Sequence, residues 1–523
     1  MDTDVCVIGG GAAGAVVAAE LAQRGVRVIV LESGPWHDMA SRPEYSRRRA
    51  RGEDPWRTAL PGLDAYTTGG SVAYPLAGRR ARGVGGSTLH WEGYALRLHA
   101  DDFRLRTRHG IAHDWPLGYD HLEPYYGRAE RALGVAGADD DPWASPRRGP
   151  FPLPAFSFGY TDGIFVRACR ELDIAVHHLP QARNSVPWAG RPRCRAYATC
   201  HACPIGAQAS TDLTHARRLA LDDRSRLLTG VTVQRLETDA AGRVAAAVYA
   251  GHDRIARRIS ARIFVLAAGA VENVRLLLLS RSPAFPAGLA NRSGVLGKYF
   301  MSHPVIDVTG RVREPVYPYR VGFSAAMSRQ FAVARDRARA GAFLLEFLQS
   351  AGPRPFEIAL TSGLWGEALR RRVAEEFGHT LGIRVYCEQL PSPDNTVTLD
   401  SDVLDYFGNP VPRITYSLGA YERTALADAA AIASRILERA GASNVGPGGL
   451  NFAAHQMGTH RMGEDPRSSV VDATLRAHDV PNLYLLGSGA FVTSAAAPPT
   501  LTIVALALRA ADHIAAHVRS PDG

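Results

Sequence analysis

A glycine-rich turn close to the N-terminus constrains the fold of this chain more than any other feature. The stretch DVCVIGGGAAGAVVAAELAQRGVRVIVLESG places Gly9, Gly11 and Gly14 in a G-x-G-x-x-G pattern. The expected elements are a strand over residues 4–8, a helix over residues 15–24 and a second strand over residues 26–31. This order of strand, glycine turn, helix and strand predicts a Rossmann-like α/β domain that binds a dinucleotide.

Each glycine of the pattern has a physical reason to be there. The three permit a tight turn, close approach of a pyrophosphate, and close packing of the helix on the strand. Backbone N–H groups and the helix N-terminus then face the phosphates. Glu32 follows the second strand, where a carboxylate accepts hydrogen bonds from ribose hydroxyls. The pattern alone does not separate NAD from FAD.

Later segments supply further nucleotide-binding features. ARGVGGSTLHWEGYALRL is a second glycine loop, in which the hydroxyls of Ser87 and Thr88 can reach a phosphate or a ring edge. RIFVLAAGAVENVRLLLLS reads as strand, small-residue turn and helix, and NLYLLGSGAFV as another strand that ends in small residues. A long C-terminal helix opens at Pro499 and Thr500, and its N-terminus carries partial positive charge.

Two histidines lie in the segment FAAHQMGTHRMG. His455 and His460 are five residues apart, which turns the second about 140° away from the first on a helix. Zinc ligands on one helix favour a spacing of four, and no third ligand is near in sequence. A general base is the better role, because a histidine with a pKa near neutrality can accept a hydroxyl proton.

Three of the six cysteines are close together. Cys194, Cys200 and Cys203 follow a C-x5-C-x2-C spacing in RPRCRAYATCHACPIGAQAS. Closely spaced thiolates suit an iron–sulfur cluster or zinc. Buried thiols, or one disulfide between two of them, are the alternative interpretation, and the spacing leaves both open.

Composition excludes some partners. The 523-residue chain has a net charge of +9, but its arginines are spread apart from RRRAR at residues 47–51. Nucleic-acid binding would gather them on one face, so no such partner is expected.

No run approaches the ~20 apolar residues of a membrane helix. The N-terminus lacks a basic signal region, which predicts a cytoplasmic protein, with co-export to the periplasm beside a signal-bearing partner as the alternative.

Taken together, these motifs resemble the glucose-methanol-choline (GMC) flavoprotein oxidoreductases. The match runs from the N-terminal glycines through GVGGSTLHW, VLAAGAVENVRLLLLS, SGVLGKYFMSHP and HQMGTHRMG to PTLTIVALALRAADHI, and is weakest at residues 35–75 and 310–380. The resemblance implies the α/β class: a discontinuous Rossmann-like FAD-binding domain plus a substrate domain with an antiparallel β-sheet and helices. The expected ranges are 1–300 and 451–523 for the first, with loop insertions about 35–75 and 134–190, and 301–450 for the second.

The resemblance also assigns contacts to FAD. It implies that the flavin and its phosphates are lined by Gly85, Gly86, Ser87, Thr88, Gly487 and Ser488, and the adenine by the backbone of Val233. Pro499 and Thr500 would place the start of the terminal helix beneath the pyrimidine ring of the flavin. A helix N-terminus there stabilises the negative charge that reduced flavin carries near N1.

The family pattern sharpens the histidine assignment. His455 falls on the active-site base, and His460 falls where relatives often have cysteine or serine, behind that base. Most relatives have asparagine or a second histidine just before the terminal helix, whereas Pro498 stands there in this chain. Proline offers no side-chain hydrogen bond, so three explanations stay open: another residue supplies the contact, the activity is slow or altered, or the substrate differs.

Two further features have family parallels. In pyranose-oxidase-like members, a histidine at the place of His90 carries a covalent flavin, with a packed, non-covalent histidine as the alternative. Members that pass electrons to a cytochrome have a C-x5-C-x3-C-P motif and a three-iron cluster. In this chain the last gap is one residue shorter.

The predicted function is FAD-dependent oxidation of a hydroxyl group, on a sugar, polyol or glycoside, by hydride transfer to flavin N5 with His455 as base. The alternatives are a flavin-containing lyase of the same fold, a dehydrogenase that passes electrons through an iron–sulfur cluster to a cytochrome, and a flavin-binding scaffold without turnover. The electron acceptor (oxygen, quinone or cytochrome) stays open, and a small accessory subunit is a further expected partner.

Overall fold

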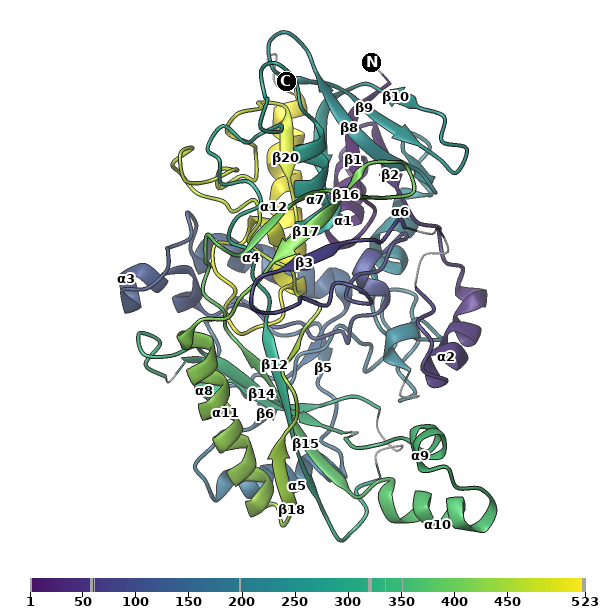
Figure 1. The fold of residues 1–523 in the computed structure, drawn as a ribbon, viewed down its shortest axis with the longest axis vertical. Helices are drawn as coiled ribbons and strands as arrows, with labels where there is room; N and C mark the ends of the chain where they lie inside the picture. The colour runs from purple at the N-terminus through teal and green to yellow at the C-terminus, as the bar shows by residue number, and fades with distance from the viewer. Residues whose placement is uncertain are drawn as a thin grey trace.

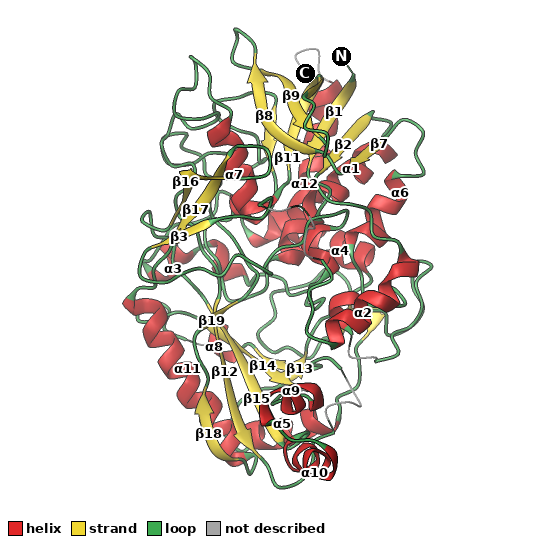
Figure 2. Ribbon diagram, turned by 45° about the vertical axis from the view of Figure 1, so that its right-hand side comes forward, coloured by secondary structure: helices red, strands yellow, loops and turns green. Residues whose placement is uncertain are grey.

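The strands form two main sheets at opposite ends of an elongated molecule (Figure 1). The computed structural model describes residues 2–56, 60, 62–196, 199–317, 322–333, 335–349 and 351–519. Both chain termini lie at the end that holds the parallel sheet, and Figure 2 shows loops and helices filling the space between the sheets. The α/β class with a separate antiparallel sheet is confirmed.

The parallel sheet is assembled from three distant parts of the chain. Its order is β20-β11-β1-β2-β7, and all neighbouring strands are parallel. The strands are β1 (Thr3–Ile8), β2 (Val28–Glu32), β7 (Arg226–Thr229), β11 (Ala261–Leu266) and β20 (Leu483–Leu485). Because parallel sheets are covered on both faces, their strands are continuously apolar, as VCVI in β1 and IFVL in β11 show.

One helix packs on a face of this sheet, and the C-terminal helix packs on that helix in turn. Helix α1 (Ala12–Gln23) begins three residues earlier than expected, because the glycine turn is complete at Gly11. Helix α12 (Thr500–Arg519) packs against α1 and α4 (Tyr119–Leu133). By length and composition alone α12 would pass for a membrane-crossing helix, but 67% of that stretch is buried inside the protein.

The antiparallel sheet has the order β18-β12-β15-β14-β13-β6, with β19 beside β12. Its strands are β6 (His177–His178), β12 (Pro304–Arg311), β13 (Ala326–Ser328), β14 (Phe343–Leu348), β15 (Thr380–Cys387), β18 (Ser443–Pro447) and β19 (Asn451–Phe452). Helix α11 (Ala420–Arg439), expected at residues 421–440, packs on β12 and β15. The alanine face of α11 encloses a second hydrophobic core together with α5 (Tyr160–Arg170), which contributes Phe165, Ala168 and Cys169.

One hairpin inside the range predicted for the substrate domain belongs spatially to the other half. Strands β16 (Thr396–Leu404) and β17 (Pro410–Thr415) form a sheet with β3 (Thr67–Gly69) and pack on α7 (Gly269–Leu279). The boundaries at residues 300 and 450 therefore stay predictions. The remaining elements are β4 (Ala136–Gly137), β5 (Leu153–Pro154), β8 (Thr232–Thr238), β9 (Val244–Ala250), β10 (Arg257–Ile259), α2 (Arg42–Ala50), α3 (Leu105–His109), α6 (Arg217–Leu219), α8 (Gln330–Val333), α9 (Pro355–Ser362) and α10 (Gly366–Glu376).

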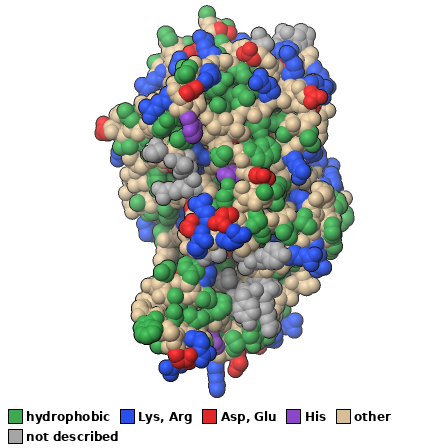
Figure 3. All heavy atoms as spheres, turned by 90° about the vertical axis from the view of Figure 1, so that its right-hand side faces the viewer, with side chains coloured by type: hydrophobic (Ala, Val, Ile, Leu, Met, Phe, Trp, Pro, Cys, Tyr) green, Lys and Arg blue, Asp and Glu red, His purple; other side chains and the backbone are tan. Residues whose placement is uncertain are grey.

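The surface charge is dispersed where it can be seen. On the face in Figure 3, blue Lys and Arg side chains are scattered among tan and green surface, and red carboxylates accompany several of them. Arg47 of α2 and Arg51, the residue after this helix, both pair with Glu44. This face offers no continuous basic stripe.

Candidate active site

A cavity of about 560 Å³ is lined by residues from both halves of the molecule. At one end lie Ile8 and Glu32, at the carboxyl ends of β1 and β2, and at the other lie Arg384 and Tyr386 of β15. Ligands of open α/β sheets bind at the carboxyl ends of the strands. The cavity is therefore where the fold places a nucleotide, with the antiparallel sheet over its far end.

The predicted site residues divide into two groups. Those that line the cavity are Gly9, Gly11, Glu32, Gly86, Ser87, Thr88, His90, Val233, His455, Gly487, Ser488, Pro498, Pro499 and Thr500. Those outside the lining are Gly14, Gly85, His460, Cys194, Cys200 and Cys203. Residues from six separate stretches of sequence thus meet around one space.

The first glycine turn leaves no room for side chains. Gly9 has φ +101°. A Cβ on it would lie 2.7 Å from the carbonyl oxygen of Ala267, the residue that follows β11. A Cβ on Gly14 would lie 1.8 Å from the carbonyl oxygen of Gly9. Gly14 therefore serves the packing of α1 on β1, and Gly9 serves the close approach of the turn to the end of β11. Gly9 and Gly11 both line the cavity.

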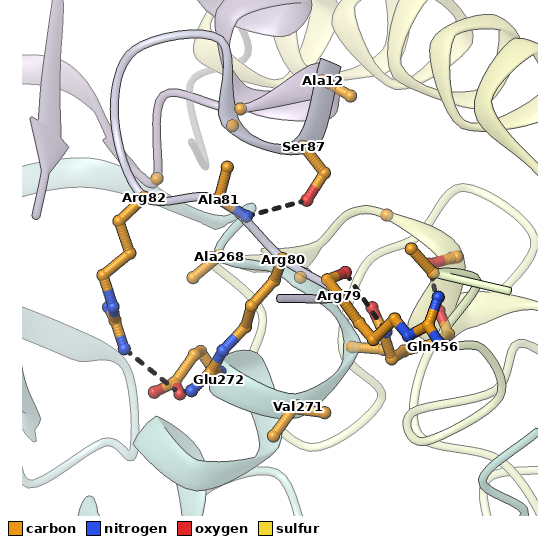
Figure 4. A pocket seen from close by; sticks show the side chains of 18 of the residues that line it. Ala12, Arg79, Arg80, Ala81, Arg82, Ser87, Ala268, Val271, Glu272 and Gln456 are labelled. Carbon is orange, nitrogen blue, oxygen red and sulfur yellow. Dashed lines mark hydrogen bonds and ion pairs between the residues drawn. The ribbon is translucent and has the colours of Figure 1, made fainter. Parts of the chain in front are cut away.

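The second glycine loop touches the first. A Cβ on Gly86 would lie 2.8 Å from Cα of Gly11, so both loops present bare backbone to the same part of the cavity. Ser87 Oγ accepts a hydrogen bond from the N–H of Ala81 at 3.4 Å (Figure 4). The Thr88 hydroxyl instead donates to the carbonyl of Gly85 at 2.6 Å, which stabilises the loop itself.

Glu32 joins these loops through its carboxylate. It accepts backbone N–H groups of Gly10 at 2.7 Å, Gly34 at 2.8 Å and Gly83 at 3.1 Å. Hydrogen bonds to an ionised acceptor are stronger than neutral ones. The contact to a ribose stays a prediction, and the structure shows that this carboxylate holds three backbone turns together.

An arginine-rich wall was not predicted. Arg80 and Arg82 converge on Glu272 of α7 (Figure 4), and Arg82 Nε also bonds Asp64 at 2.5 Å. Burial alone would raise the pKa of Glu272, but the charges of Arg80, Arg275 and Arg82 outweigh it and hold that pKa well below its usual range. The GRRAR run directly before GVGG was the available sequence signal.

The far end of the cavity holds the predicted base. His455 follows β19, and its Nδ1 lies 2.8 Å from Nδ1 of His303, the residue before β12. Tyr386 of β15 stacks on it with ring centroids 6.1 Å apart. Burial, and then the neighbouring His303, lower the pKa of His455 well below the ordinary histidine value. His455 is therefore neutral at neutral pH, the form that can accept a proton, but it is a weaker base than the near-neutral pKa expected from the sequence would make it.

The other predicted histidines behave differently. His460 is fully buried against Gly489, and burial lowers its pKa to about 3. It packs behind the cavity and does not line it. His90 lines the cavity, and burial lowers its pKa to about 3 as well. The carbonyl oxygen of His90 lies at hydrogen-bond distance from Nδ1 of His201.

The terminal helix starts at the cavity. Pro498, Pro499 and Thr500 line it beside His455, so the positive end of α12 points at the same space. The side chain of Pro498 offers no hydrogen-bond donor or acceptor. Other polar groups on this wall, missed by sequence reasoning, are Glu92, Arg384, Asn451 and Gln456.

The three clustered cysteines are free, half-buried thiols, and no disulfide joins them. Cys200 Sγ accepts a hydrogen bond from Arg183 at 3.0 Å, and burial raises its pKa. Within the described residues, which omit 197 and 198 of this loop, no group of three or more His, Cys, Asp or Glu side chains has the arrangement of a metal site. The structure therefore gives no geometric support to a cluster here.

Comparison with known proteins gives consistent matches. Residues 391–507 match the family model described as GMC oxidoreductase, and residues 2–50 match an FAD binding domain. The chain is 31% identical to the fructose dehydrogenase large subunit of Gluconobacter japonicus, over 98% of each chain. It is 32% identical to 2-methyl-1,2-propanediol dehydrogenase of Mycolicibacterium austroafricanum, over 98% of this chain and 95% of the relative.

One further relative and one solved structure are also similar to this chain. Paromamine 6'-oxidase of Streptomyces fradiae is 31% identical over 98% of this chain and 91% of its own length. Pyridoxine 4-oxidase from Mesorbium loti has a solved structure with a TM-score of 0.68 at 20% identity, covering 98% of this chain and 99% of that one. At that identity the structural match concerns the fold alone.

Proposed function

This chain belongs to the GMC oxidoreductases and is an FAD-dependent oxidoreductase of alcohol groups, and we propose that its substrate is a sugar, polyol or glycoside whose hydroxyl proton passes to His455. The observation that carries the proposal is the single cavity, with glycine loops at one end and a neutral imidazole at the other. A bound dinucleotide and a substrate hydroxyl can meet in it.

The residues present fit FAD. The loops at Gly9 and Gly86 line the cavity with bare backbone, and the start of α12 lines the same cavity as His455. Glu32 and Val233 line the end predicted for the adenosine. When bound, FAD supplies an acceptor for the hydride that leaves the substrate carbon.

His455 supplies the proton acceptor. Oxidation of an alcohol removes a hydride from carbon and a proton from oxygen, and the proton goes to the imidazole. A base that is neutral at the working pH is ready to accept it, and such proton transfer contributes about 10²–10⁴-fold to rate. The N-terminus of α12 favours negative charge in the adjoining space.

The polar wall favours a substrate with several hydroxyl groups. Glu92 and Arg384 face the cavity with their charges 4.0 Å apart, and Arg384 is held by two hydrogen bonds of 2.8 Å to Asp307. Asn451 and Gln456 add amides near His455. Relatives named for fructose, a propanediol and paromamine all act on polyhydroxylated or hydroxylated compounds.

Finer features of the cofactor and partners are also part of the proposal. A covalent flavin would attach through His90, whose lowered pKa keeps its ring nitrogens free of charge. An iron–sulfur cluster on the three cysteines would require the loop to close further. Acid precipitation, which leaves colour in the pellet only for a covalent flavin, and iron analysis test the two.

The electron acceptor and the compartment are two further parts of the proposal. The names fructose dehydrogenase large subunit and gluconate 2-dehydrogenase flavoprotein support a small accessory subunit or a cytochrome as partner. We propose a cytoplasmic protein, with co-export to the periplasm as the alternative. Purification of the native chain from cell fractions would identify both the compartment and any subunit that accompanies it.

Anaerobic mixing with a panel of sugars and polyols tests the function. The wild-type flavin absorbance should bleach with at least one of them, and His455→Ala should lower the limiting rate of flavin reduction by about 10²–10⁴-fold. His252→Ala, an exposed histidine outside the cavity, serves as the control and should leave the rate unchanged. Substrate turnover without bleaching, or full activity in His455→Ala, would overturn the proposal.

A further inference from the structure

The base is held by a second histidine that has no assigned role. His303 is fully buried and lies 152 residues before His455 in the chain. Strand β19 pairs with β12 so that Phe452 faces Pro304, and the N–H of Ala453 donates to the carbonyl of His303 at 3.0 Å. This pairing brings both rings to the same point, perpendicular to each other with centroids 5.0 Å apart.

The other side of His303 meets only hydrogen-bond acceptors. Its Nε2 lies 3.0 Å from the carbonyl oxygen of Ala495 and 3.3 Å from that of Ser494. A carbonyl cannot donate, so Nε2 of His303 must carry the hydrogen. Ala495 adopts φ +50°, a conformation uncommon for alanine, and its carbonyl receives the Ser494 hydroxyl as well.

The hydrogen on Nε2 determines the rest of the chain of contacts. Burial lowers the pKa of His303 to about 4, so the ring is neutral at neutral pH and its Nδ1 is a bare acceptor. The 2.8 Å contact then requires Nδ1 of His455 to donate. A neutral imidazole has one N–H, which leaves Nε2 of His455 without hydrogen.

We propose that His303 is a positioning residue that fixes His455 in the tautomer whose free Nε2 accepts the substrate's hydroxyl proton. This proposal rests on the proposed function. It gives His303 the orienting role that a carboxylate has behind other catalytic imidazoles. Among the described residues no protein group bonds Nε2 of His455, so this nitrogen is available to the cavity. As the proton arrives, the bare Nδ1 of His303 stabilises the charge on its partner.

Two substitutions separate the two ends of His303. In His303→Asn, the amide oxygen takes the place of Nδ1 and can still accept from His455. In His303→Gln, the longer amide can reach the Ala495 carbonyl, but no acceptor faces His455. We expect His303→Gln and His303→Leu to lower the limiting rate of flavin reduction about 10²-fold, with the substrate dissociation constant unchanged, and His303→Asn to stay within about tenfold of wild type.

The pH profile distinguishes orientation from general damage. The charged groups that face the pair are Glu92 and Arg79 toward His455 and Asp102 toward His303, and all three are retained in these variants. The limiting rate of flavin reduction by the wild type should reach a plateau near neutral pH. The rate of His303→Leu should keep rising into the alkaline range, because the hydroxyl proton must leave to solvent. FAD content and melting temperature verify folding. Parallel profiles and equal rates in all three variants would overturn the proposal.

A measurement without turnover keeps this test separate from that of the proposed function. In protein labelled with ¹⁵N-histidine, the ring signals of His455 are those lost in His455→Gln. We expect a protonated Nδ1 and an unprotonated Nε2 in wild type and in His303→Asn, and a mixture of tautomers in His303→Gln. A protonated Nε2 in wild type would refute the proposal even if the enzyme oxidises polyols. If no polyol reduces the flavin, the proposed function is wrong. The NMR spectrum still tests the tautomer of His455 independently of that result.

Discussion

Glu32 connects three backbone turns through one buried carboxylate, and we expect its replacement to lower the affinity for FAD. In Glu32→Gln the amide –NH₂ must face at least one of the N–H donors of Gly10, Gly34 and Gly83. Loss of a charged hydrogen bond costs about 1.5–3 kcal/mol, so FAD affinity should fall by about 10–150-fold. Titration of FAD-depleted protein with FAD measures this, and Glu44→Gln, an exposed carboxylate, is the control. Unaltered affinity would contradict the role of Glu32.

At the scale of residues, local chemistry was predictable and distant contacts were not. The pattern of Gly9, Gly14 and Glu32 could be recognised because all three lie within one short stretch of sequence. The backbone that leaves no room at Gly9 is nevertheless that of the distant Ala267. His303 stood in the recognised segment SGVLGKYFMSHP, yet its partner lies 152 residues away. Likewise the partner of Arg80, Glu272, comes from α7. The assignment of His460 as a neighbour of the base stays a prediction, with its ring buried away from the cavity.

Among the elements, the hairpin of β16 and β17 depends on one buried ion pair with α7. Arg275 Nη2 lies 2.6 Å from Asp405, its Nε bonds the carbonyl of Pro410, and both charged side chains are almost completely buried. Removing one partner of a buried pair costs about 3–5 kcal/mol. Arg275→Ala should therefore lower the free energy of unfolding by about that amount, measured by urea denaturation. Arg281→Ala, exposed just beyond α7, should change it by less than about 0.5 kcal/mol.

Elements with strong periodicity could be placed to within a few residues, since hydrophobic pattern and capping act locally. Helix α11 and strand β1 differ from their expected ranges by one residue, and α1 begins three residues early. The partners of each strand could not be found in this way. The hairpin over residues 396–415 has ordinary strand signals, and only its contacts with β3 and α7 show that it lies beside the nucleotide half.

Across the whole molecule, several buried histidines make stability depend on pH in one direction. Burial lowers the pKa to about 3 or 4 for each of the following residues: His90, His215, His303 and His460. Asp162 opposes them, because burial raises its pKa to about 6. In the unfolded chain these histidines titrate near 6.5.

These histidines therefore contribute stability that is fully present above pH 6.5 and is lost as the pH falls toward their folded pKa values. Below pH 6.5 these four histidines bind up to four more protons in the unfolded chain than in the folded chain, and Asp162 offsets one of them. Each proton is worth about 1.4 kcal/mol per pH unit. The urea midpoint should fall steeply between about pH 6.5 and 4.5. His215→Gln, which removes one of these protons away from the cavity, should make that slope shallower. A midpoint that stays level or rises as the pH falls would show that these imidazoles are protonated in the folded protein, and would also remove the neutral state that His303 needs in order to accept from His455.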